Sequence, residues 1–158
     1  MSYAPVNHFE YLCTPPEDPR ERFISELLRH IGNTGSIVVY NQAFEVSRLR
    51  EIARDLPAYA EKINLLFERI IDLMSPFRSR MLYHPAMKGS YSIKKVLPAL
   101  VPELSYNDLE ISEGGTASLT YMSLYEDTDQ ESILAKRENL LRYCELDTLA
   151  MVKLLEKI

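Results

Sequence analysis

One uninterrupted β-branched run, Ile-Val-Val-Tyr at residues 37–40, constrains the fold of this chain more than any other feature. A strand without polar alternation is typical of a parallel sheet, where both faces are buried. A second apolar run at residues 70–74 and a weakly alternating segment at residues 8–12 are predicted to be further strands. Because helical spacing separates these runs, the sequence predicts an α/β layered sheet with about three strands.

Five or six helices are predicted around these strands. Asp18 and Pro19 are start signals for the first helix, and Gly32 ends it. The next helix begins after Asn41 and is closed by Pro57. The remaining predicted helices cover residues 59–67, 92–101, 117–125 and 131–157.

Length and composition indicate one soluble domain over residues 1–158, with no membrane contact. The apolar runs are much shorter than the roughly 20 residues of a membrane span, and the first residues lack a signal-peptide pattern. We therefore expect a cytoplasmic protein. The chain has 18 Lys and Arg against 23 Asp and Glu, which counts against a simple nucleic-acid binder. Carboxylates that hold divalent metal would change this, because the metal supplies positive charge.

Asp147 is the most unusual residue of the last predicted helix. It shares one face with the apolar Leu140, Ala150 and Leu154 and with Tyr143. A buried carboxylate is costly unless it finds hydrogen bonds or a cation. Two interpretations follow: a structural acid bonded to backbone groups or an arginine, or a metal ligand.

The end of the strand at residues 37–40 is the second candidate site. Asn41 follows the strand directly, and Glu45 lies in the first turn of the next helix on its buried side. Ligand sites in open α/β sheets form beyond the carboxyl ends of the strands. A purely structural alternative is that Asn41 caps the helix and Glu45 interacts with its dipole.

Two segments, YNQAFE at residues 40–45 and YCELD at residues 143–147, resemble the second and third motifs of the DEDD-type 3′–5′ exonucleases. The resemblance implies a three-layer ribonuclease-H-like fold and a site for two Mg²⁺ or Mn²⁺ ions. It implies that Asp147 and Glu45 are metal ligands and that Tyr143 is catalytic, orienting the attacking water. Asn41 is expected to support the site or contact the nucleic-acid substrate.

This chain departs from that pattern in two places. The second motif of most DEDD enzymes ends in Asp, whereas Glu45 stands here, and the first motif, an Asp-x-Glu strand, is absent. Two of the four carboxylates are therefore missing, and the fold is expected to be truncated at its N-terminus. An upstream segment, a partner chain or self-association would have to cover the exposed sheet. The isolated chain is expected to be inactive.

A closer resemblance rests on three segments at residues 35–45, 84–111 and 143–155. They are similar to a bacterial family, domain of unknown function 2779. In that family this region is regarded as exonuclease-like and often forms the C-terminal part of a longer protein. The resemblance implies a divalent-metal-dependent exonuclease domain. The alternative is a non-catalytic scaffold or protein-interaction domain that keeps a degenerate exonuclease fold.

Lys88, Lys94 and Lys95 with Tyr91 form a local basic and aromatic cluster. Lys88 and Tyr91 are candidate substrate-binding residues, because such clusters contact phosphate backbones. A solvated surface is the alternative. Asp72, at the end of the strand at residues 70–74, is expected to cap the following turn rather than to bind metal.

Overall fold

The computed structural model describes residues 6–13 and 16–158. These residues form a mixed α/β chain that is mostly helical. The α-helices are α1 (Arg20–Ile31), α2 (Gln42–Asp55), α3 (Ala60–Phe67), α4 (Ser75–Arg78), α5 (Ile93–Leu100), α6 (Gly114–Ser123) and α7 (Gln130–Lys157). The strands are β1 (Ile37–Val39) and β2 (Ile70–Asp72), and two 3₁₀ turns are η1 (Pro57–Tyr59) and η2 (Pro85–Met87).

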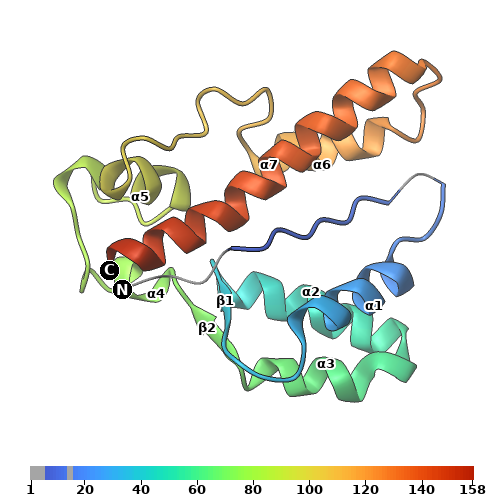
Figure 1. Ribbon diagram of the computed structural model, residues 1–158, viewed down its shortest axis with the longest axis horizontal. Helices are drawn as coiled ribbons and strands as arrows, with labels where there is room; N and C mark the ends of the chain where they lie inside the picture. Colours follow the sequence, from blue (N-terminus) through green and yellow to red (C-terminus); the bar gives the residue numbers. More distant parts are fainter. Residues whose placement is uncertain (1–5, 14–15) are drawn as a thin grey trace.

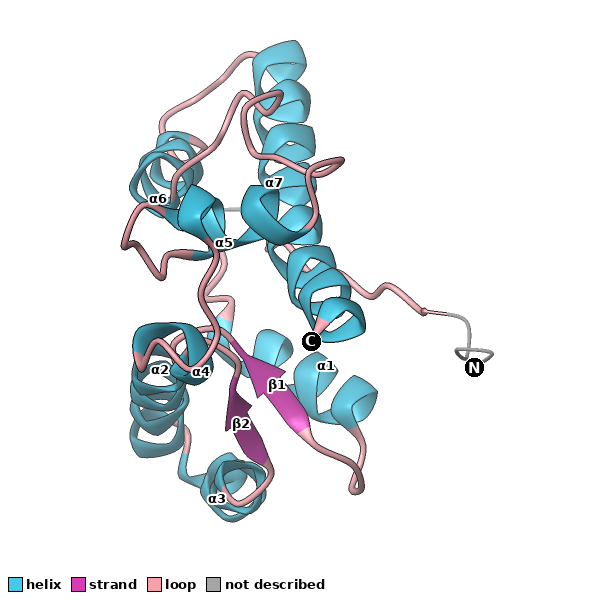
Figure 2. Cartoon of the chain, turned by 90° about the vertical axis from the view of Figure 1, so that its left-hand side faces the viewer, coloured by secondary structure: helices cyan, strands magenta, loops and turns pink. Residues whose placement is uncertain are grey.

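The two strands pair in parallel, as the β-branched run predicts. Ile37 lies opposite Ile70 and Val39 lies opposite Asp72, and α2, η1 and α3 connect them (Figure 2). Arg69, next to β2, holds the loop that leads into β1. Its guanidinium donates to the carbonyls of Gly32, Thr34 and Gly35 at 2.7, 2.6 and 2.8 Å. This fixes the start of β1 against the start of β2.

The prediction of a third strand at residues 8–12 is wrong. This segment has no regular secondary structure and lies between α1 and α7 (Figure 1). Phe9 stacks on His30 of α1 with ring centroids 3.9 Å apart, and Arg137 of α7 donates to the carbonyls of Leu12 and Cys13 at 3.0 Å. The Arg137 side chain therefore satisfies two carbonyls that, in a strand, would accept hydrogen bonds from a neighbouring strand. No described strand lies beside this segment.

The strands are less buried than the sequence predicts. All three residues of β1 are half-buried, and Ile71 of β2 is 52% exposed. The described sheet has only two strands, so its surface is not fully covered. The accessible surface, 10744 Å², is about a third larger than the roughly 8,100 Å² expected for a compact monomer of 18.3 kDa. Part of the two-stranded sheet is open to solvent.

The molecule has two apolar cores, one in each half, and both halves can be seen in Figures 1 and 2. The smaller core joins Ile24 of α1, Ile52 of α2 and Ile63 of α3. The larger core lies around α5, α6 and α7. Buried α7 residues in it are Leu140, Tyr143, Ala150 and Leu154, the face on which the sequence places Asp147.

Helix ends follow local signals. Asp129 caps α7 by accepting hydrogen bonds from the backbone N–H groups of Glu131 and Ser132 at 3.3 Å. Gly32 ends α1 with φ 63°, a left-handed conformation that favours glycine. Among the helices that the structure describes, none has the length and apolar character needed to cross a membrane.

Candidate functional site

Asp147 is half-buried on α7 and receives hydrogen bonds from two tyrosines. The Tyr106 hydroxyl donates to its Oδ1 at 2.6 Å, and the Tyr143 hydroxyl, one helical turn earlier, is a second partner. Burial raises the pKa of Asp147, while these hydrogen bonds and the charge of Lys94 act in the opposite direction. Among the described residues, the predicted need for a partner is met by hydroxyl groups and not by backbone groups or an arginine.

Tyr143 is buried between Tyr106 and the start of α6. The centroids of the Tyr106 and Tyr143 rings lie 6.2 Å apart. Gly114 of α6 is so near that an added Cβ would lie 3.7 Å from the Tyr143 hydroxyl oxygen. Burial and the nearby charge of Asp147 raise the pKa of Tyr143 well above its ordinary value. The hydroxyl therefore stays protonated near neutral pH and acts as a hydrogen-bond donor.

Glu45 brings a second carboxylate to Asp147. It lies in the first turn of α2 and is half-buried. Burial raises the pKa of Glu45, and the charge of Asp147 raises it further. Repulsion between like charges increases as they approach, and it is stronger in a partly buried site than in water. The charge of one motif residue, Asp147 on α7, therefore acts on a residue of the other motif, Glu45 on α2, although the two are far apart in the sequence.

Asn41 and Asp72 form the turn beside this pair. Asn41 has a left-handed backbone with φ 79°, and its N–H donates to Asp72 Oδ1 at 3.1 Å. The same oxygen accepts from the Met74 N–H at 3.0 Å, so Asp72 caps a turn as predicted. Within the described residues, the Asn41 side chain makes no capping bond to α2, and it is exposed to solvent.

A hollow of about 420 Å³ lies next to Tyr106. Its lining includes Lys88, Lys94 and Lys95, and the Lys94 ammonium lies 5.9 Å from the centroid of the Tyr106 ring. Lys88 therefore lines the same hollow as Tyr106, the hydrogen-bond partner of Asp147. Tyr91 is not among the lining residues that the structure describes, but its carbonyl accepts a hydrogen bond from the Tyr40 hydroxyl at 2.6 Å.

Glu45 and Asp147 are the carboxylates of the two motif segments. Mg²⁺ is commonly held by one or two carboxylates together with water and phosphate oxygens. In the described part of the chain, no group of three or more His, Cys, Asp and Glu side chains could hold a metal ion. The described residues thus lack the larger ligand set of the two-metal site that the motif resemblance implies.

Tyr106 is a residue of this site that no sequence pattern indicates. It lies in the irregular segment between α5 and α6, where no helical or strand periodicity assigns a face to a side chain. The available signal is its chemical type: a tyrosine buried among apolar residues needs a partner for its hydroxyl. That partner, Asp147, is distant in sequence, so the pairing emerges only from the fold.

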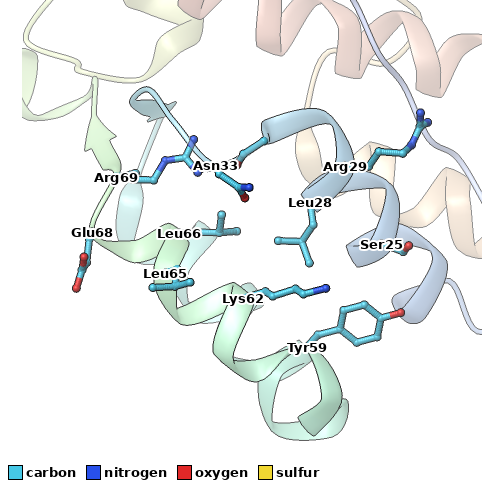
Figure 3. A pocket seen from close by; sticks show the side chains of 11 residues that line it. Ser25, Leu28, Arg29, Asn33, Tyr59, Lys62, Leu65, Leu66, Glu68 and Arg69 are labelled. Atoms are coloured by element: carbon cyan, nitrogen blue, oxygen red, sulfur yellow. Dashed lines mark hydrogen bonds between the residues drawn. The ribbon is translucent and has the colours of Figure 1, made fainter.

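A larger cavity of about 660 Å³ lies between α1 and α3 (Figure 3). Arg69 lines it, but the Arg69 N–H groups already bind loop carbonyls. Glu68 is the one acidic residue among the described lining residues. Because this cavity lacks paired carboxylates, the Glu45 and Asp147 region is the better candidate for chemistry.

Curated relatives share most of this chain. It is 29% identical over 143 residues to "Uncharacterized protein UU173" of Ureaplasma parvum serovar 3, which covers 78% of this chain and 20% of that protein. It is 31% identical over 129 residues to "Uncharacterized protein MG366 homolog" of Mycoplasma pneumoniae, which covers 74% and 19%. The chain thus spans about a fifth of the length of these bacterial relatives. No solved structure matches it significantly.

The comparison with protein families identifies one family, described as domain of unknown function (DUF2779). The match covers residues 2–92, more than half of the chain. It includes β1, Asn41, Glu45 and Lys88, and it ends at the start of α5. The chain belongs to the DUF2779 family.

Proposed function

We propose that this chain is part of a divalent-metal-dependent 3′–5′ exonuclease domain that acts on nucleic acid. One observation carries the proposal: Glu45 and Asp147, the acids of the two exonuclease-like motifs, lie close enough for the charge of Asp147 to raise the pKa of Glu45. Two carboxylates that repel each other in a partly buried site create a demand for a cation. Mg²⁺ or Mn²⁺ meets that demand with oxygen ligands.

In this proposal each residue has a distinct role. Glu45 and Asp147 hold the ion, which when bound stabilises negative charge on a phosphate and lowers the pKa of water. The Tyr143 hydroxyl, which stays protonated near neutral pH, orients the attacking water by a hydrogen bond. Its raised pKa argues against a role as general base. Asn41, exposed at the end of β1, contacts the substrate.

The remaining carboxylates of a two-metal site would come from outside this chain. We place residues 1–158 in the C-terminal part of a longer ribonuclease-H-like domain, and we expect the isolated chain to be inactive. The parallel pairing of β1 with β2 and the exposed Ile71 support a sheet that continues in another segment. An upstream segment, a partner chain or a second copy would supply the missing strand and acids.

A non-catalytic scaffold is the second candidate, and one contact favours it. The Tyr106 hydroxyl donates to Asp147 at 2.6 Å, so the acid already has a structural partner without metal. In this alternative Asp147 joins α7 to the segment before α6, and the domain acts through its exposed surfaces. The two candidates differ in one measurable property, which is specific binding of Mg²⁺ or Mn²⁺.

A thermal-shift titration with Mn²⁺ and Mg²⁺ tests the proposal. Metal that binds the folded state raises the melting temperature in a saturable way. We expect this shift for the wild type and its loss in Asp147→Asn and Glu45→Gln. Glu61→Gln is the matched control, because Glu61 lies in the first turn of α3 as Glu45 lies in that of α2. A wild type with no shift would reject the metal site and favour the scaffold.

A further inference from the structure

The segment from residue 73 to residue 102 is basic in an otherwise acidic chain. It contains no Asp or Glu, and its five cationic residues are Arg78, Arg80, Lys88, Lys94 and Lys95. The whole chain carries a net charge of −5. Because exposed charges interact over about 10 Å at moderate salt, a local excess of cations attracts anions even on an acidic protein. The segment therefore marks a surface for a polyanion.

The three lysines of this segment line one hollow. Lys88 precedes α5, Lys94 and Lys95 lie in its first turn, and all three line the hollow of about 420 Å³ with Ser105 and Asn107. In the described part of the chain, the lysines that form ion pairs are Lys136 and Lys153. Lys88 and Lys95 are thus available for an external anion, while Lys94 also lies over the Tyr106 ring and interacts with the charge of Asp147. Glu113 is the acidic residue among the described residues that line this hollow, so the three lysines leave its lining with net positive charge.

Exposed aromatic rings accompany the cations. Tyr83 is 54% exposed and Tyr91 is 46% exposed, and both lie in the same acid-free segment. The Tyr91 carbonyl accepts a hydrogen bond from the Tyr40 hydroxyl at 2.6 Å, which holds the backbone that carries this exposed ring. Cations that track a backbone, together with rings on which bases stack, are the combination that binds single-stranded nucleic acid.

The hollow and the carboxylate pair share a wall. Tyr106 lines the hollow and donates to Asp147 at 2.6 Å, while Lys94 lies over the Tyr106 ring. A strand whose phosphate occupied the hollow would therefore run close to Asp147. Tyr106 thus connects the hollow to the residue of the proposed chemistry.

We propose that the hollow between Lys88, Lys94 and Lys95 binds a backbone phosphate of single-stranded nucleic acid, with Tyr83 and Tyr91 as stacking platforms. This inference rests on the proposed exonuclease function and names where its substrate is held. Phosphate binding by ammonium groups needs no divalent metal, so the inference can be tested separately from the carboxylate site.

The test is fluorescence anisotropy with a labelled oligothymidylate of about 15 nucleotides, measured in EDTA over a range of salt concentrations. We expect the wild type to bind this strand more tightly than the matching duplex. Lys88→Gln combined with Lys95→Gln should weaken binding about tenfold and reduce the slope of log Kd against log salt by about 1.4. Lys62→Gln combined with Lys157→Gln, which removes the same charge elsewhere, is the control.

Three results would overturn the inference: a wild type that does not bind the oligonucleotide, a Lys88 and Lys95 variant that binds like the control, or a duplex bound as tightly as the single strand. Circular dichroism of each variant establishes that it is folded. Failure of the exonuclease proposal has a different signature, because it removes the Mn²⁺-induced thermal shift and leaves oligonucleotide binding in EDTA intact.

Discussion

At the scale of single residues, the site consists of two carboxylates and two tyrosines whose properties depend on one another. Hydroxyl donors stabilise the ionised form of Asp147, and burial destabilises it. The ionised form of Glu45 is destabilised both by burial and by the charge of Asp147. A protein that only needed a packed core would place apolar residues here. The arrangement is therefore a cost to folding that a bound cation would relieve.

Tyr106→Phe is expected to lower the free energy of unfolding by about 1–3 kcal/mol, because it removes a donor from a partly buried carboxylate. The ring, and with it the apolar contact, remains. Urea denaturation measures the change, and Tyr83→Phe on an exposed ring is the control. Equal stability of the two variants would show that the bond between Tyr106 and Asp147 contributes nothing to stability.

The raised pKa of Glu45 predicts a pH dependence of stability. A carboxyl whose pKa is higher in the folded state binds protons more tightly there, so its contribution to stability decreases as pH rises through that pKa. Lowering the pH from about 7 to about 5 should therefore stabilise the wild type relative to Glu45→Gln. Urea denaturation at both pH values tests this, with Glu61→Gln as control. A difference that does not change with pH would contradict the prediction.

At the scale of helices and strands, local sequence signals account for most of what the structure shows. The helices at α1, α2, α3, α5, α6 and α7 all coincide with predicted segments, because the spacing of apolar residues sets the face that a helix buries. The strand at residues 8–12 fails for a physical reason. A strand exists only with a partner, and in the described chain side chains of α1 and α7 contact this segment instead.

The two faces of α7 provide a matched test of the larger core. Leu154 is fully buried, whereas its neighbour Leu155 is 45% exposed. Leu154→Ala should lower the free energy of unfolding by about 2–5 kcal/mol, and Leu155→Ala by about 0.5 kcal/mol or less. Chemical denaturation of the two variants measures both values. Equal losses would contradict the assignment of the buried face.

The candidate site was less predictable than the helices. Asp147 and Glu45 were found because each carboxylate breaks an otherwise apolar helical face. That they interact depends on how the fold places α2 relative to α7, which no local pattern encodes. The same limit applies to Tyr106, whose partner lies 41 residues away in the sequence. Single residues with unusual chemistry were thus visible in the sequence, and their pairing was not.

At the scale of the whole molecule, the accessible surface is about a third larger than that of a compact monomer of this mass. Its accessible area of 10744 Å² includes exposed side chains such as Ile71 on β2 and Phe44 on α2. The chain also spans about a fifth of the length of its relatives. Because exposed apolar surface is common where partners bind, we propose that another segment or chain covers part of this surface.

We expect the isolated chain to bind a hydrophobic dye and to self-associate at micromolar concentration. Light scattering after size-exclusion chromatography measures the mass, and Ile71→Lys should reduce both dye binding and association. Leu119→Lys, which changes an exposed residue of α6, is the control. A monomer that binds no dye would contradict the account of an open sheet.

The central claim is that Glu45 and Asp147 together hold one divalent cation. Isothermal titration calorimetry with Mn²⁺ tests it most directly, because it gives the number of bound ions as well as their affinity. The account predicts a single saturable Mn²⁺ site in the wild type, lost in both Glu45→Gln and Asp147→Asn. Binding that persists unchanged in Asp147→Asn, or no binding by the wild type, would contradict it.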